Sequence, residues 1–101
     1  MKKAYIAGSY RSDTENGIYE NIQKAREVAK KYWKLGYAVF CPHLNTAFMG
    51  GVCDDSVWLD GDLVYLQDTD VVVMMKGWAS SQGAKTERRV AKQLGKEIIY
   101  E

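Results

Sequence analysis

The sequence has few of the residues that hold metals or form disulfides. It contains two cysteines, Cys41 and Cys53, and a single histidine, His43. The cysteines lack CxxC spacing and no histidine cluster accompanies them, which argues against zinc and leaves two reduced thiols as the expected state. Cys41 lies at the end of an apolar run, where packing is its expected role. We therefore expect no metal site.

The sequence also lacks a long apolar run and an excess of either charge. Nothing approaches the roughly 20 apolar residues that cross a membrane, and the first apolar run is too short for a signal peptide. Fourteen basic and thirteen acidic residues give a net charge of +1. Electrostatics therefore offers no argument for a nucleic acid polymer or a membrane surface as partner. We expect a cytoplasmic protein that holds any bound anion locally.

Two phosphate-binding motifs are absent as well. The chain has neither the GxxxxGK[ST] motif of a P-loop nor a GxGxxG dinucleotide fingerprint. No internal repeat or low-complexity linker divides it. With 101 residues, 47% of them hydrophobic, the chain can build one core and is too short for two. Residues 1–101 are therefore expected to form a single domain.

Strand-like and helical patterns alternate along the chain. Four apolar runs have the length of strands: residues 4–7, 37–41, 70–75 and 98–100. Between them, apolar residues recur at helical spacing from Ile18 to Trp33, from Val57 to Leu66 and from Ala84 to Leu94. This order is typical of a parallel sheet with right-handed crossovers. The predicted fold class is therefore α/β: a single-domain, flavodoxin- or Rossmann-like three-layer sandwich with a four-stranded parallel sheet.

The loops that follow the strands are expected to face one crevice. In parallel α/β folds, ligands collect beyond the carboxyl ends of the strands, which here are followed by residues 8–16, 42–51 and 76–83. The second loop is long and contains glycine, so it is a lid or an oligomer contact, and both interpretations are open. Apolar surface at Tyr32, Trp33 and the Met49 loop favours a homo-oligomer, a dimer or tetramer.

One predicted helix carries a carboxylate on its apolar face. At helical spacing Glu87 shares a stripe with Ala84, Val90, Ala91 and Leu94. Removing a carboxylate from water costs several kcal/mol unless it is paired, hydrogen-bonded or protonated. Asp62 borders the inward stripe of the preceding helix in the same way. Catalysis and a structural ion pair with lysine or arginine are both open as explanations.

Two loops offer donors for an anion. Gly8 ends the first strand and lets the backbone approach a ligand, while Ser9 and Arg11 add a hydroxyl and a forked cation. A solvated arginine in an ordinary turn is the alternative. Ser81 and the backbone near Gly83 begin the Glu87 helix, where the dipole favours anions. Ser81 is equally explained as an N-cap.

An aromatic residue and the histidine complete the candidate site. Trp78 lies in the loop before the Glu87 helix, where it either stacks on a bound ligand or covers the end of the sheet. His43 follows Pro42 on the ligand-facing edge and is either a contact to the ligand or an ordinary loop residue.

Three segments together resemble the nucleoside 2-deoxyribosyltransferase-like superfamily. The resemblance extends to its small phage and bacterial deoxyribosyltransferase-like domains and to the related 2-deoxynucleoside 5-monophosphate N-glycosidases. It covers nearly the whole chain and depends on the order and spacing of residues 5–11, 62–73 and 81–87.

The resemblance implies a set of roles. Glu87 would be the nucleophile at the anomeric carbon, Tyr5 would hydrogen-bond and position it, and Asp62 would assist departure of the base. Ser9, Arg11 and Ser81 match positions that hold a 5-phosphate in the monophosphate hydrolases. The expected partner is a small nucleoside or nucleotide, with no metal or organic cofactor.

The expected function is cleavage or exchange of an N-glycosidic bond of a (2-deoxy)nucleoside or its 5-monophosphate. The alternative is a non-catalytic module that binds or sequesters a nucleotide in the same crevice.

Overall fold

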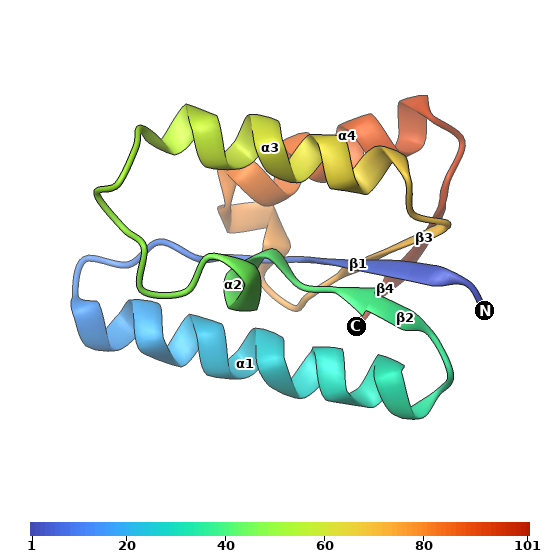
Figure 1. Cartoon of the computed structure of the whole chain (residues 1–101), viewed down its shortest axis with the longest axis horizontal. Coiled ribbons are helices and arrows are strands. Elements are labelled where there is room, and N and C mark those ends of the chain that lie inside the picture. Colours follow the sequence, from blue (N-terminus) through green and yellow to red (C-terminus); the bar gives the residue numbers. More distant parts are fainter.

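Four parallel strands form the middle layer of the molecule: β1 (Lys3–Ala7), β2 (Ala38–Phe40), β3 (Val71–Met74) and β4 (Glu97–Tyr100). The computed structural model describes residues 1–101 and orders the strands β2-β1-β3-β4. Figure 1 shows helix α1 (Glu15–Lys34) below the sheet and helices α3 (Asp55–Gln67) and α4 (Gln82–Gln93) above it. The predicted fold class, a single α/β domain with three layers, is confirmed.

Alternation along the central strands divides the core into two halves. Successive side chains of a strand point to opposite faces, so Ala4 and Ile6 of β1 pack on the α1 side, and Tyr5 and Ala7 pack beneath α3 and α4. Strand β3 is buried on both faces along its whole length, as its uninterrupted apolar sequence predicts. Tyr5 thereby enters the same layer as α4.

Two loop boundaries differ from the sequence prediction. Helix α1 begins at Glu15, within the segment expected to be a polar loop, because the Thr14 side chain accepts a hydrogen bond from the Gly17 N–H at 2.9 Å and caps the helix. The long loop after β2 begins with a short helix, α2 (Pro42–Asn45). Proline suits the first turn of a helix, so Pro42 both ends the strand and starts α2.

Some expected core residues face solvent instead. On α3, Leu66 is fully buried, whereas Val57 and Val64 are 51% and 61% exposed. These valines lie opposite Leu66 around the helix, and only one face of α3 packs on the sheet and α4.

Trp33 is an exposed residue as expected, but Tyr32 is buried against the α1 side of the sheet and supplies no surface for an oligomer. Leu94 caps α4 and is half exposed.

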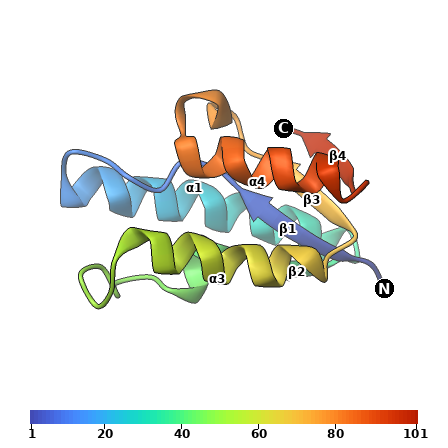
Figure 2. The ribbon, with the colours of Figure 1, turned by 90° about the horizontal axis from the view of Figure 1, so that it is seen from above.

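The carboxyl ends of the strands point towards the left-hand end of the molecule in Figure 1. Figure 2 shows α3 and α4 side by side above the sheet. Their N-terminal ends lie at this same end of the molecule. No helix is both long and apolar enough to cross a membrane. The fold thus brings the loops after β1, β2 and β3 to one edge, as expected for a parallel sheet.

Gly8 allows β1 to end in close contact with Met75. A Cβ at position 8 would lie 2.6 Å from the Met75 sulfur and 2.9 Å from its Cβ. We expect Gly8→Ala to lower the free energy of unfolding by about 1–3 kcal/mol through overpacking, as measured by urea denaturation. Gly61→Ala on α3 is the control, since nothing lies within 4 Å of its added Cβ. This control should raise stability by about 0.5–1 kcal/mol, and equal losses in both variants would contradict the packing argument.

Candidate active site

Helix α4 presents Glu87 on its buried face, about one turn after its N-terminus. Ser81 caps the helix by accepting a hydrogen bond from the Ala84 N–H at 3.2 Å. Glu87 is 6% exposed, and its Oε2 accepts a hydrogen bond from the Tyr5 hydroxyl, 82 positions earlier in the chain. This bond joins α4 to the central strand β1. It also satisfies one oxygen of a carboxyl group that would otherwise be costly to bury.

Aromatic stacking fixes the orientation of the Tyr5 ring. The centroid of the Phe40 ring lies 5.7 Å from that of the Tyr5 ring. The Tyr65 ring stacks on Phe40 in turn, with 4.5 Å between their centroids. Burial and the neighbouring Glu87 carboxyl raise the pKa of Tyr5 above its ordinary value. The Tyr5 hydroxyl therefore keeps its proton and acts as a fixed donor to Glu87.

No lysine or arginine pairs with Glu87 or Asp62. The three ion pairs of the structure join other residues: Arg11 to Asp55, Lys30 to Glu27 and Lys31 to Glu101. The structural ion pair considered from the sequence is therefore absent. The cost of burying the Glu87 carboxyl is met by a hydrogen bond and by a change in protonation.

Burial changes the proton affinity of both carboxyl groups. It raises the pKa of Glu87 to about 8, with a further increase from the nearby Asp62 charge and an opposing effect from the Tyr5 hydrogen bond. Burial likewise raises the pKa of Asp62 to about 6. Two electrostatically coupled carboxyls with raised pKa values are typical of sites that carry out acid–base or covalent chemistry.

Glu87 and Asp62 open into one cavity of about 580 Å³. The cavity lies at the carboxyl end of the sheet, and its volume falls in the range of roughly 300–1,000 Å³ that is usual for small-molecule sites. The structure brings most of the predicted site residues to its wall: Gly8, Ser9, Arg11, His43, Asp62, Ser81, Gly83 and Glu87.

Tyr5 and Trp78 do not line this cavity. Tyr5 lies behind Glu87, where it contacts the carboxyl and not the open space. The short 3₁₀ helix η1 (Trp78–Ser80) directs Trp78 to the side, with the Arg88 guanidinium 4.9 Å from its ring and the Tyr100 ring 6.0 Å away. Trp78 thus covers the end of the sheet, which is the second of the two interpretations left open by the sequence.

His43 stabilises the loop after β1. Its Nε2 lies 3.0 Å from the carbonyl oxygen of Ser9, and a carbonyl can only accept, so Nε2 carries the hydrogen. The ring is 5% exposed, and its Nδ1 has no hydrogen-bond partner. Burial lowers the pKa of His43, which keeps the ring neutral at physiological pH. His43 thereby orders the Ser9 segment of the wall.

The N-terminus of α4 supplies free donors to the cavity. The backbone N–H groups of Gln82 and Gly83 make no hydrogen bond, as is usual for the first residues of a helix. The Ser81 oxygen is occupied as the cap, and its hydroxyl hydrogen remains available. A Cβ at Gly83 would meet only the Ser81 oxygen, at 3.9 Å, so the glycine keeps this part of the wall open.

Several wall residues were missed in the sequence. Trp58, Tyr10 and Asp55 line the cavity. Trp58 had a detectable signal, because it precedes Asp62 by four residues and so shares its helix face. Asp55 lies in the first turn of α3 and forms an ion pair with Arg11 across the loop. That pairing is a tertiary contact with no local sequence signal.

The family described as "Domain of unknown function (DUF4406)" matches residues 2–100. A comparison with curated proteins finds no match.

Two solved structures share the fold. A 2-deoxyribosyltransferase from the psychrotolerant bacterium Bacillus psychrosaccharolyticus aligns with a TM-score of 0.67 at 19% identity, over 97% of this chain and 70% of that chain. A conserved protein from Enterococcus faecalis V583 aligns with a TM-score of 0.64 at 20% identity, over 99% of this chain and 62% of that chain. At these identities the similarity shows a nucleoside 2-deoxyribosyltransferase-like fold.

The raised pKa of Glu87 makes stability depend on pH. A carboxyl whose pKa rises from the ordinary value of 4.5 to about 8 on folding stabilises the fold below the first value and loses that contribution as pH rises through the second. Glu87→Gln keeps an acceptor for Tyr5 and has no such proton. We expect the variant to exceed the wild type in free energy of unfolding by on the order of a few kcal/mol near pH 9, measured by urea denaturation across pH. Parallel pH profiles of the two proteins would contradict the buried-carboxyl argument.

Proposed function

The chain belongs to the DUF4406 family, and we propose that it cleaves or exchanges the N-glycosidic bond of a (2-deoxy)nucleoside or its 5-monophosphate through a glycosyl ester on Glu87. The observation that carries the proposal is the buried Glu87 carboxyl, held by the Tyr5 hydroxyl and facing Asp62 in one cavity. The 2-deoxyribosyltransferase fold adds support from similarity alone.

The chemistry needs charge stabilisation on both sides of the bond. As the bond between the anomeric carbon and the base nitrogen breaks, positive charge develops on the sugar and negative charge on the base. A carboxylate oxygen of Glu87 attacks the anomeric carbon, and the electrons of the broken bond pass to the base. Asp62 donates a proton or a hydrogen bond to that base. Water then resolves the ester in a hydrolase, or a second base resolves it in a transferase.

Tyr5 has a positioning role in this scheme. Its ring is fixed by stacking on Phe40, so its hydroxyl holds one oxygen of Glu87 and leaves the other free to attack. Trp58 offers a flat apolar surface on the wall one helical turn from Asp62, suited to stacking on a base whose departure Asp62 assists.

The two carboxyl groups share the proton that the reaction needs. Attack requires an ionised Glu87, and base departure requires a protonated Asp62. With pKa values of about 8 and about 6, the pair holds one proton over the interval between them. In the free site that proton is on Glu87, which has the higher pKa. Positive charge on the reacting sugar favours its transfer to Asp62.

Base release is the direct test of the function. Wild-type protein is incubated with a panel of deoxynucleosides and their 5-monophosphates, with and without an acceptor base, and free base is followed by chromatography. We expect Glu87→Gln to lower the rate by about 10³-fold or more, because it removes the nucleophile while keeping the Tyr5 hydrogen bond. Glu97→Gln makes the same change at an exposed position of β4 and should retain activity.

Other outcomes distinguish the alternatives. Base exchange without net hydrolysis identifies a transferase, and release without an acceptor identifies a hydrolase. Tight nucleotide binding without release of base, unaffected by Glu87→Gln, would contradict the enzymatic proposal and favour a non-catalytic binding module.

The coupled carboxyls also predict the pH dependence of the reaction. We expect a bell-shaped profile of kcat/KM with limbs near the values of about 6 and about 8 found for Asp62 and Glu87. Below the lower limb both groups are protonated and the nucleophile is lost; above the upper limb both are ionised and the acid is lost. The Asp62→Asn variant removes the acid and should lose the upper limb of the profile. A profile that stays level below about pH 6 and above about pH 8 would contradict the shared proton.

A further inference from the structure

The wall of the cavity has an uneven distribution of charge. Its only lysine or arginine is Arg11, and it carries three carboxyl groups, those of Asp55, Asp62 and Glu87. Asp62 and Glu87 belong to the reacting end, where a cationic sugar develops. Asp55 has no role in that chemistry and lies at the start of α3.

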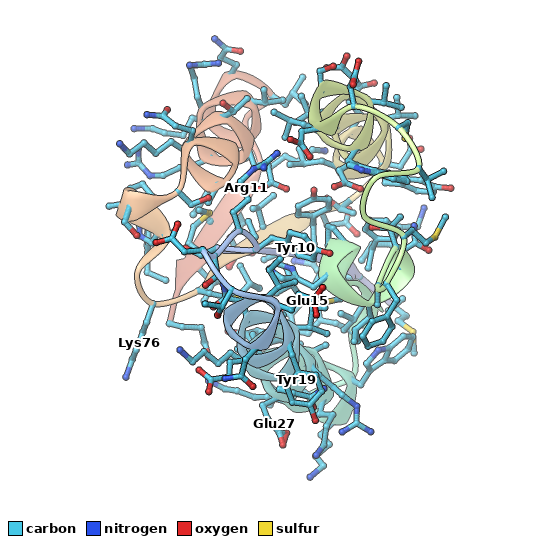
Figure 3. The ribbon with its side chains drawn as sticks, turned by 90° about the vertical axis from the view of Figure 1, so that its left-hand side faces the viewer. Tyr10, Arg11, Glu15, Tyr19, Glu27 and Lys76 are labelled. Atoms are coloured by element: carbon cyan, nitrogen blue, oxygen red, sulfur yellow. The ribbon has the colours of Figure 1, made fainter.

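Arg11 is bound to Asp55. A guanidinium nitrogen of Arg11 contacts Oδ2 of Asp55 in an ion pair between the loop after β1 and the first turn of α3. In Figure 3 the Arg11 side chain extends from its loop towards the two helices that cover the sheet. Both side chains are largely exposed, at 70% and 67%. A surface pair of this kind adds little to the stability of the fold, and both of its members line the cavity.

We propose that the Arg11–Asp55 pair disfavours phosphate esters, so that the cavity takes the neutral nucleoside in preference to its 5-monophosphate. Asp55 is then a specificity-determining residue, and we call this effect of the pair the charge filter. This deepens the proposed function and rests on it for the identity of the ligand.

The argument is one of charge balance. A phosphate monoester carries between one and two negative charges at neutral pH and needs a cation that is free to bind it. The single cation of the wall is already neutralised by Asp55, and a phosphate beside Arg11 would also meet the Asp55 carboxylate, a like charge.

The other donors of the wall carry no full charge. The N–H groups of Gln82 and Gly83 and the hydroxyls of Ser9 and Ser81 are neutral. They can bind a sugar hydroxyl without a counter-charge. The dipole of α4 contributes a fraction of a charge at most, and it falls off within the first turn.

The test measures the ratio of kcat/KM for a 5-monophosphate to kcat/KM for the matching deoxynucleoside, at low ionic strength. The wild type is expected to favour the nucleoside. Asp55→Asn frees Arg11, and we expect it to raise the monophosphate-to-nucleoside ratio about tenfold. Asp54→Asn is the matched control: it removes the same charge one residue earlier, from an exposed side chain outside the wall that makes no capping hydrogen bond. Its ratio should equal that of the wild type.

A double variant separates the pair from general electrostatics. In Asp55→Asn combined with Arg11→Gln the gain for the monophosphate should disappear, because the freed guanidinium supplies it. A wild type that prefers the monophosphate, a gain that survives the loss of Arg11, or an equal gain in Asp54→Asn would each overturn the filter.

Calorimetric binding keeps this inference distinct from the catalytic proposal. Titrating a deoxynucleoside and its 5-monophosphate into the Glu87→Gln protein, with and without Asp55→Asn, measures the preference without turnover. If the wild type releases no base, but the Glu87→Gln protein binds the nucleoside better and Asp55→Asn shifts that preference about tenfold towards the monophosphate, catalysis fails and the filter stands. If the wild type releases base, but the Glu87→Gln protein has the same binding preference with and without Asp55→Asn, the filter fails and catalysis stands.

Discussion

The hydrogen bond from Tyr5 to Glu87 is the contact on which the site depends. It joins the central strand to the helix that closes the upper layer, across 82 positions of sequence. Stacking of Tyr5 on Phe40 and of Phe40 on Tyr65 extends the same contact to β2 and α3. The donor to the carboxyl is therefore fixed by a stack of rings that runs through β1, β2 and α3. A group held in this way pays its reorganisation cost during folding and not during a reaction.

Burial of Glu87 has two opposite consequences. It removes the carboxyl from water and raises its pKa to about 8, which costs stability in neutral and alkaline solution. The same burial strengthens the field of the carboxylate on the cavity side, where the proposed reaction would develop a cationic sugar. A site that weakens the fold is usual where activity requires an unfavourable arrangement of charges. Asp62 is less buried than Glu87 and its pKa rises less, so the two carboxyl groups ionise at different pH values.

The parallel sheet explains why distant segments meet. Because all four strands are parallel, they end at the same edge. The segments after β1, β2 and β3 supply Ser9, His43 and Ser81 to one wall. His43 then fixes the Ser9 carbonyl, so one wall segment orders another. The Arg11–Asp55 pair makes a comparable connection between the first loop and α3. Each connection is between neighbours in space and not in sequence.

Sequence patterns alone determined the alternation of strands and helices, the buried β3 strand and the anomalous placement of Glu87 and Asp62 on apolar helix faces. These features are local, because periodicity and capping depend on residues a few positions apart. Tertiary structure decided the rest. Trp78 turned away from the cavity, Trp58 joined its wall, and Val57 and Val64 faced solvent because α3 packs on one side only. The partner of a charge, as for Arg11 and Asp55, is chosen by the packing of whole elements, and no local pattern records it.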